Sequence, residues 1–125
     1  MNTKEINILA LAFLGDSVYE LYIRDYLLKK GINDVNKLQK ETVKYVSAKN
    51  QAAIIEKLQK EGFFSSSEMN IIKRGRNNRS SNHPKNCDIL TYKYATGLEA
   101  LVGELYLKKN TNRLEQLFNK IWEEN

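Results

Sequence analysis

Two carboxylates lie inside the most apolar stretches of this 125-residue sequence. Asp16 stands in LALAFLGDSVYELY, residues 9–22, and Glu99 stands in GLEALVGELY, residues 97–106. A carboxylate taken out of water without a partner is destabilising, so each acid needs solvent, a hydrogen bond or a positive charge. If both segments are helices that pack together, the acids can converge on a hard cation such as Mg²⁺. Such an ion activates water and offsets charge on a phosphodiester, so the pair is a candidate nuclease site.

A structural role is the alternative for each acid taken alone. A lone acid on a helix is often satisfied by a hydrogen bond or by a basic partner, and Arg24 is a candidate partner here. The metal hypothesis therefore depends on the two acids meeting in the fold.

The excess positive charge is concentrated in one segment. The chain carries 20 Lys and Arg against 15 Asp and Glu, a formal net charge of +5. Residues 73–93 hold all of this excess, because their basic residues face Asp88 alone. Such a segment is typical of a protein that binds a polyanion, although a solvated loop that aids solubility has the same composition. The basic residues are Lys73, Arg74, Arg76, Arg79, Lys85 and Lys93.

The sequence excludes several other kinds of site. Cys87 is the single cysteine, so an intramolecular disulfide or a zinc site built on paired cysteines is ruled out. His83 is the only histidine and lies in a polar stretch, which favours a solvated or phosphate-contacting role over that of a general base. No apolar run reaches the length of a membrane span and no secretory signal precedes the first helix, so we expect a cytoplasmic protein.

Helical spacing of apolar residues runs through nearly the whole chain and predicts one all-α domain of roughly six helices. Ser65 and Glu68 have the spacing of a capping box, which marks the start of the fourth helix. Gly75 and Pro84 predict a loop over residues 75–86. The expected helices run from about Ile6 to Lys30, from Asp34 through Val46, through Ala52–Leu58 to Gly62, from Ser65 to the loop, from Asp88 to Lys109, and through Leu114–Trp122.

Two motifs resemble those of the ribonuclease III family. AFLGDSVYE, residues 12–20, resembles the signature helix of that family, and LEALVGELYL, residues 98–107, resembles its second motif. The similarity spans nearly the whole chain and implies that residues 1–125 form one ribonuclease III-like catalytic domain. Three shorter runs resemble the short bacterial branch of the family, the Mini-ribonuclease III proteins: KRGRN at 73–77, PKN at 84–86 and TYKYAT at 91–96.

The resemblance carries over two of the family's four metal-associated carboxylates, Asp16 and Glu99. Ala12 stands where the wider family has the Glu of its first motif, and Thr96 stands where it has the Asp of its second. The short branch shares this reduction. Fewer anionic ligands imply a site that holds Mg²⁺ more loosely and relies more on water and RNA phosphates. The number of ions, one or two, stays open.

The resemblance implies an Mg²⁺-dependent endonuclease that works as a homodimer on double-stranded RNA and leaves 5′-phosphate and 3′-hydroxyl ends. Asp16 and Glu99 would bind the metal and carry the catalysis, and Phe13 matches an aromatic position that helps form the dimer contact. The short branch is associated with maturation of the large-subunit (23S) ribosomal RNA precursor. The residues expected to bind RNA, mainly through phosphates and 2′-hydroxyls, are Lys73, Arg74, Arg76, Asn77, Arg79, Lys85 and Asn86.

Two other classes of function stay open at this stage. A non-catalytic RNA-binding or ribosome-associated module that keeps the fold would explain the two missing carboxylates, although it would gain nothing from retaining Asp16 and Glu99. A helical protein-interaction domain would bind no RNA even at low salt. The cleavage site and any need for a ribosomal protein cofactor are also open.

Overall fold

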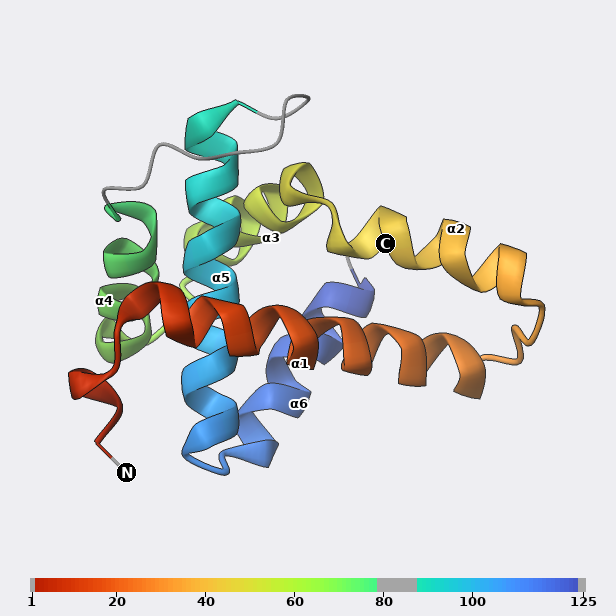
Figure 1. Cartoon of the computed structure of the whole chain (residues 1–125), viewed down its shortest axis with the longest axis horizontal. Helices are drawn as coiled ribbons and strands as arrows, with labels where there is room; N and C mark the ends of the chain where they lie inside the picture. Colours follow the sequence, from red (N-terminus) through yellow and green to blue (C-terminus); the bar gives the residue numbers. More distant parts are fainter. Residues whose placement is uncertain (1, 79–87, 124–125) are drawn as a thin grey trace.

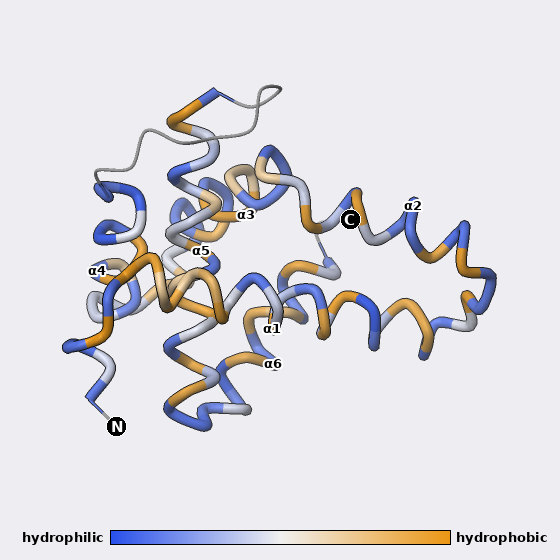
Figure 2. The backbone as a smooth tube through the Cα atoms, in the orientation of Figure 1, coloured by the Kyte–Doolittle hydropathy of each residue, from blue (hydrophilic) through white to orange (hydrophobic). Residues whose placement is uncertain are grey.

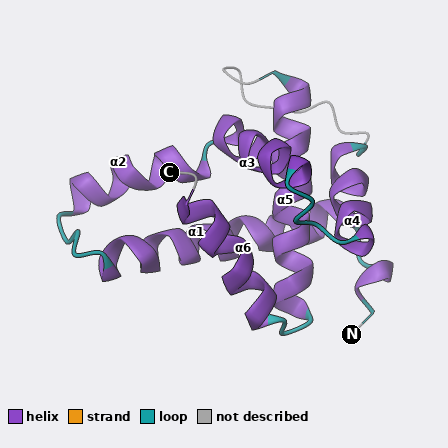
Figure 3. Ribbon diagram, turned by 180° about the vertical axis from the view of Figure 1, so that it is seen from behind, coloured by secondary structure: helices purple, strands orange, loops and turns teal. Residues whose placement is uncertain are grey.

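The computed structural model describes residues 2–78 and 88–123, and every regular element in these ranges is helical (Figures 1 and 3). This confirms the predicted all-α class. None of the helices in the described ranges is long and apolar enough to cross a membrane. A short 3₁₀ helix, η1 (Thr3–Glu5), precedes α1 (Ile8–Lys29), α2 (Val35–Val46), α3 (Ala48–Lys60), α4 (Ser66–Arg76), α5 (Ile89–Leu107) and α6 (Thr111–Glu123).

The central feature of the fold is the crossing of α1 over α5 (Figure 1). The two backbones touch there, because Gly15 of α1 lies against Glu99 and Gly103 of α5. A Cβ at Gly15 would clash with the Glu99 carbonyl oxygen, and a Cβ at Gly103 would clash with the Leu11 carbonyl oxygen. Glycine at these positions therefore permits a crossing that any larger residue would force apart.

A second pair of glycines brings α4 against α5. A Cβ at Gly75 would lie 2.6 Å from the Cα of Gly97, and a Cβ at Gly97 would lie 2.6 Å from the Ile72 carbonyl oxygen. Gly75 is thus a packing residue within a helix, and the prediction that it opens a loop was wrong, since α4 continues to Arg76. Most of the predicted loop, from residue 79 onward, lies outside the described residues.

The core fills the space between these crossing helices. Figure 2 shows hydrophobic residues gathered on the first half of α1, where it lies over α5. The remaining helices cover the pair from the other sides, with α3 and α6 in front in the view from behind (Figure 3). The largest fully buried side chains include Leu11, Tyr19, Ile23, Ile55, Leu58, Ile72, Leu98, Leu101, Leu117, Phe118 and Ile121.

Aromatic rings hold α6 against the second half of α1. The Tyr22 ring stacks on Phe118 with centroids 4.5 Å apart, and the Tyr26 ring stacks on Trp122 at 3.9 Å. Tyr45 of α2 meets Trp122 edge-on at 5.6 Å. Offset stacking and edge contacts of this kind stabilise beyond the area that they bury. The three helices α1, α2 and α6 are therefore joined through one aromatic cluster.

The start of α4 is tied to α6 by a charged pair. The predicted capping box is present, with Ser65 and Glu68 bonding each other's backbone amides. Arg113 of α6 donates from Nε and Nη2 to the Glu68 carboxylate at 2.8 and 2.7 Å, and from Nη2 to the Phe63 carbonyl oxygen at 2.7 Å. Burial alone would raise the pKa of Glu68, but the hydrogen bonds from Arg113 and Ser65 outweigh it and lower that pKa.

Candidate functional site

Asp16 and Glu99 meet where α1 crosses α5. Asp16 directly follows Gly15, and Gly15 packs on the backbone of Glu99. Burial, hydrogen bonding with the Asp16 side chain and the negative charge of Asp16 together raise the pKa of Glu99 to about 8. With its pKa raised in this way, Glu99 favours either a proton or a bound cation.

The two acids differ in exposure. Asp16 is exposed in the single chain, whereas Glu99 is half-buried. Solvent, one of the three options for an acid in this apolar run, is thus open to Asp16: α1 turns Asp16 toward the same open side as Phe13 and buries Ala12 instead. The open side leaves room for an ion and a substrate to reach the pair.

The structural alternative for Asp16 is not realised. Arg24 forms an ion pair with Glu20, one turn away on α1, with Nη2 3.0 Å from the Glu20 carboxylate. Among the described residues, no basic side chain forms an ion pair with either Asp16 or Glu99. The counter-charge that the two acids need can thus come from outside the chain.

Gln51 is a member of the site that the sequence reasoning missed. Its side chain is buried on α3 with 2 % exposure, and its Nε2 donates to the Glu99 Oε2 at 3.5 Å. This hydrogen bond favours the ionised form of Glu99 and opposes the rise in its pKa. Gln51 lies in phase with Ile54, Ile55 and Leu58 on the buried side of α3, so a polar residue inside an apolar stripe was the signal that could have revealed it.

The donor set fits a hard divalent cation. Two carboxylates are oxygen donors of the kind that Mg²⁺ prefers, and the ion typically completes its shell with water and substrate phosphate. Within residues 2–78 and 88–123, no three Asp, Glu, His or Cys side chains form a cluster that could hold a metal. Ala12 offers no donor, and the Thr96 hydroxyl donates to the Tyr92 carbonyl oxygen of its own helix at 3.0 Å. The two acids therefore stand without further carboxylate support.

The basic run at the end of α4 is spread around the helix. The Arg76 guanidinium lies over the Tyr94 ring, 5.7 Å from its centroid, and Arg76 Nε donates to the Asn77 side chain at 3.1 Å. Lys73 and Arg74 are exposed. These side chains are accessible to a polyanion. The other predicted RNA-binding residues, Arg79, Lys85 and Asn86, and also His83 and Cys87, lie outside the described residues.

One face of α1 exposes a row of large apolar side chains. Phe13 is 83 % exposed, and Leu9, one turn earlier on the same side of α1, is also exposed, as are Leu21 and Leu28 further along the helix. Exposed apolar residues that form a row, rather than scattered singles, are typical of a surface that another protein covers. Asp16 lies at the edge of this face.

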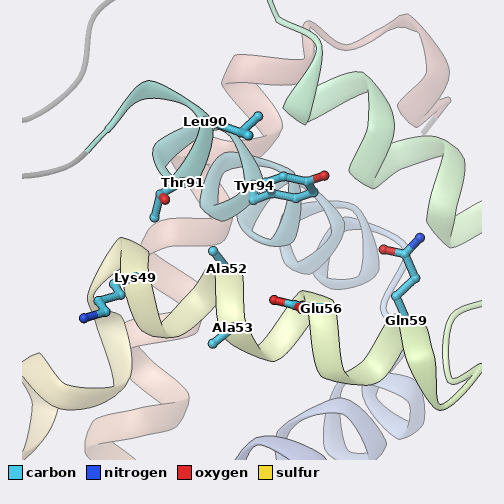
Figure 4. Close-up of a pocket in the computed structure, with 8 residues that line it drawn as sticks. All are labelled: Lys49, Ala52, Ala53, Glu56, Gln59, Leu90, Thr91 and Tyr94. Carbon is cyan, nitrogen blue, oxygen red and sulfur yellow. The ribbon is translucent and has the colours of Figure 1, made fainter.

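A groove of about 520 Å³ runs between α3 and the first turns of α5 (Figure 4). Lys49 and Glu56 bring opposite charges to it, and Leu90 and Tyr94 form part of its apolar lining. Neither of the paired carboxylates lines this groove. This groove is therefore separate from the candidate site, which lies at the crossing of α1 and α5.

Comparison with known proteins gives a consistent match. The model of the Ribonuclease III domain matches residues 9–110. A Mini-ribonuclease 3 of Staphylococcus aureus is 46 % identical over 118 residues, which cover 94 % of this chain and 88 % of the relative. A Mini-ribonuclease 3 of Streptococcus pneumoniae is 48 % identical over 112 residues, which cover 90 % of this chain and 88 % of the relative.

A solved structure shares the whole fold. The crystal structure of a protein from Fusobacterium nucleatum superposes with a TM-score of 0.85 at 33 % sequence identity, covering 100 % of this chain and 99 % of the other. Sequence and structure thus agree over the helices that carry Asp16 and Glu99. The chain belongs to the ribonuclease III family, among its Mini-ribonuclease 3 members.

Proposed function

We propose that this ribonuclease is an Mg²⁺-dependent endonuclease that cleaves double-stranded RNA as a homodimer, with residues 1–125 as its catalytic domain. Its proposed substrate is the precursor of 23S ribosomal RNA in the cytoplasm, since the relatives over nearly its full length are Mini-ribonuclease 3 proteins. The proposed products carry 5′-phosphate and 3′-hydroxyl ends.

The observation that carries the proposal is the Asp16–Glu99 pair. Two acids from distant parts of the sequence come together at the crossing of two helices, although like charges repel. A protein that only binds RNA has no use for such a pair beside a surface meant for an anion. A divalent cation would relieve the repulsion and bring the phosphodiester to the acids.

The residues of the candidate site and of the basic run have separate parts in the proposed mechanism. Asp16 and Glu99 would hold the metal ion, and Gln51 would fix the orientation of the Glu99 carboxylate through its hydrogen bond. When bound, Mg²⁺ acts as a Lewis acid and lowers the pKa of water, which supplies the nucleophile at neutral pH. Lys73 and Arg76 would bind backbone phosphates and so orient the duplex.

Duplex RNA is the proposed substrate because the accessible charge suits a backbone rather than bases. Lys73 and Arg74 are exposed and Arg76 lies on an aromatic ring beside Asn77. A-form RNA is recognised mostly by shape, phosphates and 2′-hydroxyls, which Lys, Arg and Asn side chains contact without reading sequence. Affinity should then fall steeply as the salt concentration rises.

A homodimer is proposed because the exposed face of α1 needs a cover. Phe13, Leu9 and Leu21 would lose most of their exposed area against the same face of a second copy, as a two-fold symmetric interface requires. Asp16 at the edge of this face would then place the sites of the two protomers near one another, one for each strand of a duplex.

Cleavage of a duplex RNA by the full chain tests the proposal. We expect cleavage with Mg²⁺ and none after chelation, and Asp16→Asn should abolish it. Asp25→Asn is the matched control, because Asp25 lies on the same helix, is exposed and pairs with Lys29 at 2.9 Å. Equal cleavage by the wild type and the Asp16 variant would remove the metal role of Asp16. Tight RNA binding without cleavage by the wild type would favour the non-catalytic module.

A further inference from the structure

The two arginines at the end of α4 point to different sides of the helix. Arg74 and Arg76 are two residues apart, which is about 200° around a helix. Arg76 lies over Tyr94, whereas Arg74 lines a cavity of about 480 Å³ between η1, α4 and the C-terminal end of α5. The basic run, expected to act as one RNA-binding surface, is therefore divided between two surfaces.

The cavity that Arg74 lines has an excess of positive charge. Lys4, Arg74 and Lys108 bring three cations to it, and Glu104 brings one acid. Glu104 is buried and already satisfied, since it accepts hydrogen bonds from the Thr3 hydroxyl and from Lys108 Nζ, both at 3.3 Å. Lys4 and Arg74 have no acidic partner among the described residues. Two uncompensated positive charges thus face this cavity, which we name the Lys4–Arg74 cavity.

Neutral donors complete the lining. Ser67 and Asn70 stand one turn apart on α4, on the same face as Arg74, and both line the cavity. A hydroxyl, an amide and two cations are the donors that bind phosphate oxygens in proteins. We infer that the Lys4–Arg74 cavity is an anion site, additional to the surface around Arg76, and that it binds a phosphate group of RNA.

This site is separate from the carboxylate pair. Glu104 follows Glu99 by five residues, which is about 140° around α5. The cavity therefore opens on a different face of α5 from the one where Asp16 and Glu99 meet. A phosphate bound there is not the one being cleaved: it belongs either to the backbone some distance along the duplex or to a 5′-phosphate end. That the phosphate comes from RNA rests on the proposed function.

The first experiment uses inorganic phosphate alone and needs no RNA cleavage. Phosphate is titrated into the wild-type chain while the NMR signals of the Ser67 and Asn70 amides are followed. We expect saturable shifts at both positions, and their loss in the double variant Lys4→Gln/Arg74→Gln. The matched control is Lys37→Gln/Lys40→Gln, which removes two exposed charges on α2 and should keep the shifts. Shifts that survive in Lys4→Gln/Arg74→Gln would overturn the assignment.

The second experiment measures duplex binding in an Asp16→Asn background, so that the RNA stays intact. Duplex affinity falls as the salt concentration rises from about 50 to about 200 mM. Each lost phosphate contact should make this fold-decrease in affinity roughly threefold smaller. We expect this reduction for Lys4→Gln/Arg74→Gln and not for the α2 control. An equal salt response in the two double variants would contradict the inference.

Duplexes with 5′-phosphate and with 5′-hydroxyl ends distinguish the two sources. A loss of affinity for both duplexes assigns the site to backbone phosphates, and a loss confined to the phosphorylated duplex assigns it to cleaved ends. If phosphate binds but the chain cleaves no RNA, the anion site is supported and the proposed function fails. If the chain cleaves RNA but Lys4→Gln/Arg74→Gln changes neither the phosphate shifts nor duplex binding, the proposed function stands and the anion site is contradicted.

Discussion

Gly15 of α1 and Gly103 of α5 lie backbone against backbone, and the carboxylate pair is positioned by this contact. A Cβ on Gly15 would stand 2.9 Å from the Gly103 nitrogen, and a Cβ on Gly103 would stand 3.2 Å from the Gly15 nitrogen. Asp16 and Glu99 flank the same contact along their helices. The close approach of two helices at these glycines is therefore what lets the two acidic side chains meet.

Gly15→Ala should separate the helices and destabilise the fold by about 3 kcal/mol, because the new Cβ clashes with a backbone oxygen that cannot move away alone. Urea unfolding measures this. Gly31→Ala is the control: Gly31 has a φ of 102° but an open surrounding, so that change should cost only about 1 kcal/mol of backbone strain. Equal losses in the two variants would mean that contact at the crossing is loose.

Gln51→Leu should weaken metal binding without unfolding the protein. Leu fills a similar volume but cannot donate to Glu99, and the loss of such a partner to a ligand typically costs 10–100-fold in metal affinity, of which we expect about tenfold here. Calorimetric titration with Mn²⁺ gives the affinity. Gln59→Leu on the exposed side of the same helix should leave it unchanged. The same affinity in both variants would reduce Gln51 to a packing residue.

Phe13→Asp should shift the proposed dimer toward monomer, because it places a charge in the middle of the apolar face of α1. Sedimentation velocity over a range of concentrations reports the shift. Leu90→Asp tests specificity, since Leu90 is also exposed, at 57 %, but lies on α5 away from this face. A dimer that tolerates the change at Phe13 but not the one at Leu90 would move the interface to another surface.

The Glu68–Arg113 pair should make stability depend on acidic pH. The pKa of Glu68 is lowered in the folded protein, so its contribution is complete above the ordinary pKa of a glutamate, about 4.3, and is lost as the pH falls below that value. The difference in unfolding free energy between the wild type and Glu68→Gln should therefore be constant near neutral pH and shrink in acid. A difference that stays constant down to the acid transition would contradict the lowered pKa.

Lys109→Gly should stabilise the protein by about 0.5–1 kcal/mol. Lys109 follows α5 in a left-handed conformation with a φ of 58°, which glycine adopts without strain. Thermal unfolding checks the gain. Lys30→Gly makes the same change at a C-cap with ordinary right-handed backbone, where no strain is relieved, so it should lower stability. A loss of stability in both variants would show that Lys109 is unstrained.

Local features of the fold were predictable from the sequence. The Ser65–Glu68 capping box depends only on residues three positions apart, and it marks the start of α4 as predicted. Apolar spacing predicted the helices in the described residues, because that spacing records which face each helix buries. Gly75 was misread for the same local reason: a glycine within a helix and a glycine that ends one look alike until the partner, Gly97, is known.

The site was only half predictable. Asp16 and Glu99 could be paired because both interrupt apolar helices and match the two motifs of a family. Gln51 reaches Glu99 across 48 positions of sequence, and no spacing rule encodes that contact. The same holds for Glu104, whose partner Thr3 lies 101 positions away. Division of the basic run between two surfaces also needed the position of η1 and the end of α5.

The stacking of α6 on α1 sets the size of the unit that folds. The family model ends its match at residue 110, just before α6 begins at Thr111. Yet Phe118 and Trp122 cover Tyr22 and Tyr26 of the helix that carries Asp16. A chain trimmed to the matched residues would leave those rings in water and would expose the interior along half of α1. The stable unit therefore needs α6 as well as the residues that the family model matches.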